Sequence, residues 1–357
     1  MRTPTLTNMK AKETVMLIHD TIAFHNCAEL VPAPRGGLAL ARLPVAIIPA
    51  LSRLGQHVAW AADGIELRFT GARDWLCLTL EARSALFYAD AAYAEVFYGD
   101  LPVTSVTIPD GAVRTLRLMA PDSLAQLAPS AWAHRQFASD LWRVRLSGAG
   151  VIFHGLESAG AVIRPPNADE TPAVRWLAYG SSITNCTPGY VHHAARLLGV
   201  DVANKGMSGS CACEPEVASY LAACDWDIAT LELGVNLRGT PTPEFERRAR
   251  HMVSTLRAAK PTHPIVLITI FPNGDDHLRT PNCMSQANCE YRDVLRRIHA
   301  EAGDTNLHLV EGDRVLDAFF GLSADLIHPS PEGNFRMGAN LAAILSPIIA
   351  DIPQTLT

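Results

Sequence analysis

Four short motifs in the second half of the chain carry groups that can together cleave an ester. They supply a serine hydroxyl, a glycine N–H, an asparagine amide and an aspartate–histidine pair. In chain order they are Gly180-Ser181-Ser182-Ile183-Thr184, Ser208-Gly209, Gly234-Val235-Asn236 and Asp325-Leu326-Ile327-His328. A hydroxyl activated by a base can attack a carbonyl carbon, and N–H donors can stabilise the oxyanion that forms. Each motif is common alone, so the interpretation depends on the fold bringing all four together.

Ser182 is the candidate nucleophile. It follows the apolar run 174–179, and Gly180 permits a sharp turn just before it. A serine hydroxyl is a poor nucleophile unless a base takes its proton. Taken alone, this serine is an ordinary turn or cap residue, because strand-to-helix turns favour Ser and Gly.

Asp325 and His328 are the candidate base pair. Three residues apart on a tight turn, the Asp325 carboxylate can reach one nitrogen of the His328 ring. That contact fixes the tautomer and leaves the other ring nitrogen facing Ser182. The alternative is a segment leading into a helix, with incidental polar residues.

Gly209 and Asn236 are the candidate oxyanion donors. A glycine lets a backbone N–H approach a ligand without a Cβ in the way. Asn236 follows the apolar run 228–233, so its side-chain amide is placed at the end of a strand, where it can donate to a developing negative oxygen. Either residue alone is read more simply as a turn former.

The elements that must position these groups alternate in the second half of the chain. Five short apolar runs predict strands at 174–179, 200–203, 228–233, 265–270 and 307–310, and helical patterns lie at 190–198, 243–259, 286–302 and 331–350. Strands alternating with helices predict a parallel sheet with helices on both faces. Reactive groups in such sheets gather beyond the carboxyl ends of the strands, where all four motifs fall or can reach.

The first half follows a different pattern. Apolar residues alternate with polar ones at several places in 60–155, which predicts an antiparallel sandwich or jelly roll. Val106 and Ile108 precede Asp110-Gly111, and apolar alternation resumes after it, so we expect a hairpin there. The proline-rich segment 164–172 is the best linker. We therefore expect a sandwich domain at 1–165 and a catalytic α/β domain at 172–357.

The four motifs resemble those of the GDSL, or SGNH, hydrolase family. The family pattern Gly-Asp-Ser-x-Thr corresponds to 180–184, the block-two glycine to Gly209, Gly-x-Asn to 234–236, and Asp-x-x-His to 325–328, followed by Pro329. The resemblance spans residues 172–352. One departure is Ser181, which stands where the family has aspartate and leaves the geometry of this turn open.

The resemblance implies a flavodoxin-like three-layer domain without a metal. It further implies Ser182 as nucleophile, His328 as base and Asp325 as the residue that orients it. The implied oxyanion hole consists of the Ser182 and Gly209 N–H groups and the Asn236 amide. A preceding β-sandwich resembles a two-domain subgroup, in which some members deacylate carbohydrates and others move acyl groups onto small natural products.

Three functions stay open at this stage. The first is a serine esterase that cleaves an O-acyl ester of a carbohydrate or small natural product through an acyl-enzyme. The second is an acyltransferase, because water and an acceptor hydroxyl use the same base. The third is a non-catalytic glycan-binding protein, against which the intact set of motifs speaks.

The composition limits the kinds of binding partner and the cellular location that we expect. The chain has 357 residues, of which 48% are hydrophobic and 18% charged, with a net charge of −6, so nucleic acid is not an expected partner. No apolar run has the length of a membrane span, and the run 15–18 ends too soon for a secretory signal. The eight cysteines are spread too thinly for a disulfide framework. We expect a cytoplasmic protein without cofactor or metal, and self-association stays open.

Overall fold

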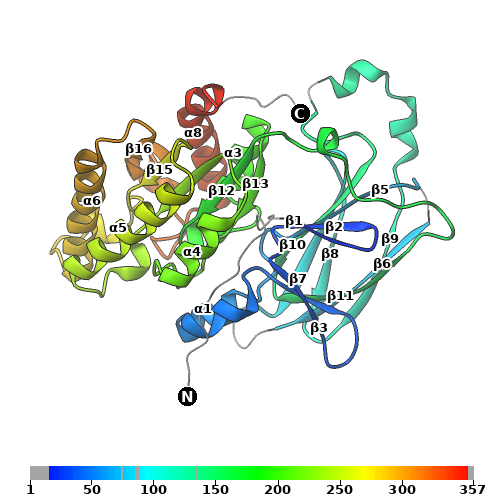
Figure 1. Ribbon diagram of the computed structural model, residues 1–357, viewed down its shortest axis with the longest axis horizontal. Helices are drawn as coiled ribbons and strands as arrows, with labels where there is room; N and C mark the ends of the chain where they lie inside the picture. Colours follow the sequence, from blue (N-terminus) through cyan, green and yellow to red (C-terminus); the bar gives the residue numbers. More distant parts are fainter. Residues whose placement is uncertain (1–15, 74, 85–88, 134, 353–357) are drawn as a thin grey trace.

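The chain forms an antiparallel β-sandwich followed by a parallel α/β sheet, as the computed structural model in Figure 1 shows. The structure describes residues 16–73, 75–84, 89–133 and 135–352. The N-terminal tail, on which the expectation about a secretory signal largely rested, lies outside the described residues. The predicted combination of an antiparallel and a parallel half is confirmed.

The sandwich consists of two sheets among the described residues. The first has the order β1 (Met16–His19), β2 (Ile22–His25), β5 (Glu66–Thr70), β10 (Leu141–Gly148), β7 (Ala91–Tyr98) and β8 (Leu101–Pro109). The second has the order β3 (Glu29–Pro32), β4 (Leu38–Ala41), β11 (Gly150–Glu157), β6 (Leu76–Arg83) and β9 (Val113–Leu118). Every second residue of β6 and β10, for example Leu78 and Val144, is buried between the sheets.

The predicted hairpin at Asp110-Gly111 is wrong. Strand β8 pairs with β7 in the first sheet, whereas β9 pairs with β6 in the second, so the turn carries the chain from one sheet to the other. Gly111 has a positive φ of 74°, and its N–H donates to Ala82 of the second sheet. The alternation of Leu116 and Leu118 is the same in either arrangement, because both bury one face of the strand.

Short helices connect or flank these strands. They are η1 (Val45–Ala50), α1 (Arg53–Val58), η2 (Asp122–Gln126), η3 (Pro129–Trp132) and, in the predicted linker, η4 (Ala168–Glu170). The segment with η1 and α1 packs away from the sandwich: Leu43, Ile48 and Val58 belong to the hydrophobic cluster of the parallel sheet. A piece of the N-terminal half is thus part of the core of the C-terminal half.

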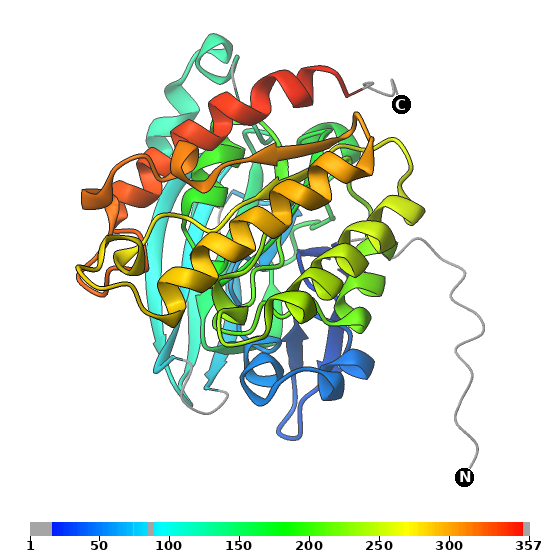
Figure 2. The same cartoon turned by 90° about the vertical axis from the view of Figure 1, so that its left-hand side faces the viewer.

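The parallel sheet has the order β13 (Asp201–Asn204), β12 (Arg175–Tyr179), β14 (Ile228–Glu232), β15 (Ile265–Ile268) and β16 (Leu307–Val310). In chain order this is 2-1-3-4-5, the flavodoxin-like arrangement. Helices α3 (Tyr190–Leu198) and α8 (Pro331–Ala350) pack together on one face. Helices α4 (Pro215–Ala223), α5 (Thr242–Ala259) and α6 (Cys283–Ala302) cover the other, and Figure 2 shows α6 in front and α8 along the top.

The layers follow from the sequence of the strands. In β12, Trp176 and Ala178 contribute to the cluster under α3 and α8, whereas Leu177 and Tyr179 contribute to the cluster under α4, α5 and α6. Both faces of each strand are therefore apolar, as expected for a sheet covered on both sides. Among the described residues, no helix combines the length and the apolar character that crossing a bilayer requires.

Two predicted helix starts need correction. Helix α6 begins at Cys283 rather than Gln286, because the Asn282 side chain accepts the N–H groups of Met284 and Ser285 and caps the helix there. Helix α5 begins at Thr242, one residue before the predicted start at 243, and the Thr242 hydroxyl donates to Glu290.

A buried ion pair joins the two halves at the edge of the parallel sheet. The Arg68 guanidinium of β5 donates to both Asp201 oxygens of β13, at 2.7 and 2.8 Å, and its Nε donates to Glu66 at 2.9 Å. The Arg68 side chain is 2% exposed. Because the pair is shielded from water, loss of either partner would leave a buried charge without compensation between the two halves.

Candidate active site

The structure brings Ser182, His328 and Asp325 together in one line. The Ser182 Oγ lies 2.7 Å from His328 Nε2, and His328 Nδ1 lies 2.6 Å from Asp325 Oδ2. Ser182 opens the short helix α2 (Ser182–Asn185) directly after β12, and the other two residues lie on the loop before α8. The two segments are 146 residues apart in sequence and meet beyond the carboxyl ends of the strands.

The Asp325 carboxylate is held in position by its own loop. Its Oδ1 accepts the backbone N–H groups of Ile327 and His328 at 3.0 and 2.9 Å, which leaves Oδ2 for the imidazole. Although burial acts to raise the pKa of Asp325, these hydrogen bonds and the His328 ring lower it to about 2. The carboxylate is therefore ionised at neutral pH and favours the ring tautomer with the proton on Nδ1.

Leu326 shapes the same loop. It has a φ of +57°, which is uncommon for a residue with a branched side chain, and its carbonyl accepts the Gly274 N–H at 2.7 Å. Ser323 fixes the other end of the loop, because its N–H and hydroxyl both donate to the His328 carbonyl. The left-handed turn at Leu326 lets the chain reverse so that Asp325 faces the His328 ring.

Ser181 and Ser182 occupy different environments. Ser181 is fully buried, and its hydroxyl caps α2 by accepting the Ile183 N–H at 3.2 Å. Ser182 is partly exposed and points to His328. Serine at position 181, where the resemblance predicts aspartate, is thus compatible with the contact between Ser182 and the imidazole.

Three N–H donors have no hydrogen-bond partner among the described residues: the backbone N–H groups of Ser182 and Gly209 and the side-chain NH₂ of Asn236. The Ser182 N–H is free because the first turn of a helix leaves its N–H groups unpaired. Asn236 Oδ1 accepts the Cys211 N–H at 3.1 Å, which orients its NH₂ away from that loop. Gly209 has a φ of +64°, and a Cβ there would lie 2.7 Å from Leu54 Cδ2.

Hydrogen bonds donated by backbone N–H groups tie the three donor loops to one another. The Met207 N–H donates to the Gly180 carbonyl at 2.8 Å, which joins the loop after β13 to the serine turn. The bond from Cys211 to Asn236 joins that loop to η5 (Val235–Leu237). All five residues predicted for the site therefore lie on the loops and short helices that follow the carboxyl ends of the strands.

Side chains that the sequence analysis did not single out support these loops from the N-terminal half. Asn185 Nδ2 donates to Asp63 at 2.8 Å and to the Ser208 hydroxyl at 2.9 Å, and its Oδ1 accepts from Arg42 at 2.8 Å. Arg42 also donates to the Gly206 carbonyl at 2.7 Å. The signal in the sequence was a single arginine within the apolar run 38–43, which is unusual for a buried strand end.

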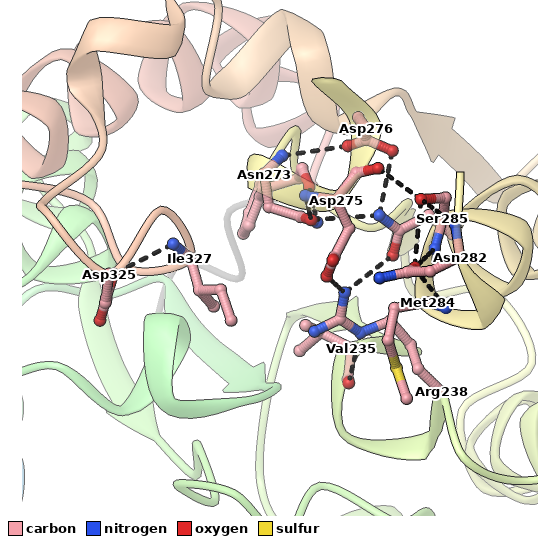
Figure 3. Close-up of polar contacts among 12 residues, drawn as sticks. Val235, Arg238, Asn273, Asp275, Asp276, Asn282, Met284, Ser285, Asp325 and Ile327 are labelled. Carbon is pink, nitrogen blue, oxygen red and sulfur yellow. Dashed lines mark hydrogen bonds and ion pairs between the residues drawn. The ribbon is translucent and has the colours of Figure 1, made fainter. Parts of the chain in front are cut away.

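The loop 272–282, which contains the short helix η6 (Gly274–His277) and leads into α6, lies at the same end of the sheet. Figure 3 shows Arg238, two residues after Asn236, turned toward Asp275 of this loop, with Asp325 and Ile327 apart from the cluster. Arg238 donates to Asp275 at 2.6 Å and to Asn288 at 3.3 Å, so it is an internal ion pair. Within the described ranges, no group of three His, Cys, Asp or Glu side chains is arranged to hold a metal ion.

The comparison with protein families decides the identity of this half of the chain. Residues 178–335 match the model of the GDSL-like lipase/acylhydrolase family. These residues form a GDSL-like acylhydrolase domain. The match includes all five predicted site residues of the acylhydrolase domain, and no curated protein matches the chain significantly.

Solved structures similar to the whole chain contain both halves. A salicylyl-acyltransferase, SsfX3, from a tetracycline biosynthetic pathway has 18% identity and a TM-score of 0.75, with 94% of this chain and 96% of that one covered. A family two carbohydrate esterase from Clostridium thermocellum, in complex with cellohexaose, has 16% identity and a TM-score of 0.54, with 82% and 94% covered. An acetyl xylan esterase from Butyrivibrio proteoclasticus has 12% identity and a TM-score of 0.55, with 94% and 97% covered. The sandwich followed by an acylhydrolase domain is thus a shared fold.

Proposed function

We propose that the protein is a serine acyl hydrolase that cleaves an O-acyl ester of a carbohydrate or small natural product through an acyl-enzyme. The observation that carries the proposal is the contact of 2.7 Å between Ser182 Oγ and His328 Nε2, with Asp325 on the opposite ring nitrogen. A serine so placed can lose its proton to the imidazole as it attacks a carbonyl.

The reaction then follows from the geometry. Ser182 Oγ forms a bond to the ester carbonyl carbon while its proton passes to His328 Nε2. The three unpaired donors at Ser182, Gly209 and Asn236 stabilise the oxyanion of the tetrahedral intermediate. His328 returns its proton to the leaving alcohol, and the acyl group stays on Ser182. Water then attacks the acyl carbon while its proton passes to His328 Nε2. As this second tetrahedral intermediate collapses, His328 returns the proton to the leaving Ser182 Oγ and the free acid is released.

Covalent labelling tests the proposal directly. We expect a fluorophosphonate to label the full-length protein at one residue, and peptide mass spectrometry to place the label on Ser182. With short-chain p-nitrophenyl esters, the same peptide should gain the mass of the acyl group during turnover. A folded wild-type protein that neither takes the label nor hydrolyses any ester of such a panel would contradict the proposal.

Transfer to an acceptor hydroxyl is the second candidate. It is favoured by the similarity to the salicylyl-acyltransferase, which extends over both halves of the chain with a TM-score of 0.75. The same acyl-enzyme serves both reactions, so product analysis separates them. When acceptor alcohols or sugars are added during turnover, a new ester at the expense of free acid supports transfer, whereas free acid alone supports hydrolysis.

Loss of the Asn236 donor should reduce turnover strongly. We expect Asn236→Ala to lower kcat by roughly 10²–10³-fold with little change in KM, because the donor acts on charge that exists only in the transition state. Asn236→Asp is the matched variant: it keeps an oxygen for the Cys211 N–H but replaces the NH₂ donor by negative charge. Its kcat should be at least as low, as measured by p-nitrophenyl ester kinetics, and a fully active Asn236→Asp enzyme would exclude this residue from the oxyanion site.

A further inference from the structure

Glu232 is a buried carboxyl group directly beneath the proposed nucleophile. It is the last residue of β14, the central strand of the parallel sheet, and is 1% exposed. Its Oε2 accepts the Ser181 N–H at 2.7 Å and the Thr184 hydroxyl at 3.2 Å. Its Oε1 is buried without a hydrogen-bond partner among the described residues. Burying a carboxyl group with one oxygen unpaired is costly and calls for an explanation.

The contacts of Glu232 reach all three loops that carry the proposed donors. Its side chain holds the serine turn through Ser181, and a Cβ added to Gly180 would lie 2.6 Å from Oε2, so the turn sits directly on the carboxyl group. Its backbone carbonyl accepts the Cys211 thiol of the second loop at 3.8 Å. Its strand continues into Gly234, at the start of the third loop, which carries Asn236.

The groups around Glu232 are neutral. Thr184, which donates to it, is bonded to the Tyr190 hydroxyl of α3 at 2.8 Å, and Cys211 faces it from the loop after β13. Within the described part of the chain, no lysine, arginine or histidine forms an ion pair with it. Burial therefore raises the pKa of the Glu232 carboxyl to about 7, an increase that the hydrogen bonds from Ser181 and Thr184 partly offset.

We propose that Glu232 is a positioning residue that sets the Ser182 turn relative to the oxyanion donors, acting through the acceptor oxygen that its side chain presents to the Ser181 N–H. The inference rests on the proposed function of Ser182. It assigns the acceptor, and not the negative charge, as the feature that matters, because the turn offers Glu232 donors while no cation is placed to balance a charge. The turn thus has no carboxyl group of its own at position 181, which is serine, and the carboxyl group that contacts it comes from β14 instead.

Three variants test this inference. Glu232→Gln keeps an acceptor oxygen at the same reach but cannot be charged, and we expect its kcat to stay within about threefold of wild type. Glu232→Asp keeps the charge but withdraws the acceptor from the Ser181 N–H, and Glu232→Ala removes it. For both we expect kcat and the rate of fluorophosphonate labelling to fall by roughly 10²-fold with little change in KM, the scale of a misplacement of about 1 Å.

The outcomes separate this inference from the proposed function. If wild type is labelled and turns over esters while the aspartate and alanine variants match it, the positioning role is wrong and the proposed function stands. A glutamine variant as impaired as the aspartate variant, or an active aspartate variant beside an inactive glutamine variant, would likewise overturn the inference. Should the alanine variant not fold, the glutamine and aspartate pair carries the comparison.

Thermal melts provide a second readout. Since the folded pKa of about 7 lies above the ordinary 4.5 of glutamate, the folded state holds this proton more tightly than the unfolded state. The stabilisation is complete below pH 4.5 and is lost as the pH rises through 7. We therefore expect Glu232→Gln to gain Tm relative to wild type between pH 5 and pH 8. A Tm difference that stays constant over this range would mean that the folded protein balances the charge of Glu232. That result would overturn the assignment of the acceptor, and not the charge, as the feature that matters.

Discussion

Replacing Ser182 by alanine should lower kcat for ester hydrolysis on the order of 10⁴- to 10⁶-fold, the scale at which an acyl-enzyme route is lost. The Ser182 hydroxyl is the one placed 2.7 Å from the imidazole, and no neighbouring hydroxyl takes its place. Ser181, the adjacent residue, is buried and bonded to the Ile183 N–H. The variant should also take no fluorophosphonate, and stopped assays with purified protein measure both effects.

Ser181→Ala is the matched control for this experiment. It removes a hydroxyl from the neighbouring residue and with it the cap of α2, for which we expect a stability loss of about 1 kcal/mol. Label should still be found on Ser182, and turnover should persist. If Ser182→Ala keeps the label and Ser181→Ala loses it, the nucleophile is Ser181 and the mechanism above is wrong.

Removing the charge of Arg68 should have the largest effect on stability. We expect Arg68→Met to cost about 3–5 kcal/mol at pH 7, because it leaves the Asp201 carboxylate buried without its partner. Methionine keeps much of the apolar volume of the side chain, so the loss reports mainly on charge. Urea unfolding followed by tryptophan fluorescence measures it, since Trp142 and Trp176 are buried in the two halves.

The destabilisation caused by Arg68→Met should depend on pH. Burial acts to raise the pKa of Asp201, but Arg68 holds it below the usual value, so the carboxylate stabilises the fold above that range and this contribution is lost in acid. Without Arg68, Asp201 binds a proton more readily, and the difference between variant and wild type should shrink from pH 7 to pH 4. Asp317→Ala, which breaks the exposed pair with Arg336, is the control and should leave unfolding unchanged. An equally small effect of Arg68→Met would show that the two halves do not depend on this pair.

The sequence was sufficient to predict the parallel sheet and the residues at its edge because both depend on local signals. Each strand is a short apolar run, and each motif follows a strand, so the rule that functional groups gather at the carboxyl ends places them together. The contact between Ser182 and His328 could not be read from the sequence, because neither motif specifies how far apart the two side chains lie in the fold.

The features that were missed depend on contacts between remote segments. The alternation at Leu116 and Leu118 predicts a buried strand face but not the sheet to which that face belongs, and this is why the hairpin was wrong. Arg42 finds its partners at Asn185 and Gly206, and no local pattern reports such a pairing. Glu232 lies within the run 228–233, and no local pattern predicts that its side chain contacts the serine turn.

The openness of the site has a consequence for how its activity should be measured. The side chains of His328 and Asp325 are 45% and 51% exposed, so bulk solvent hydrates the dyad in the free protein. Electrostatic stabilisation is strongest where water is displaced, and here the protein leaves part of that displacement to its ligand. A bulky acyl or alcohol group that covers the exposed side chains of Leu54 and Leu326 would displace water from His328 and Asp325 on binding. We therefore expect small chromogenic acetates, which cannot cover the site, to turn over more slowly than esters with a bulky acyl or alcohol group.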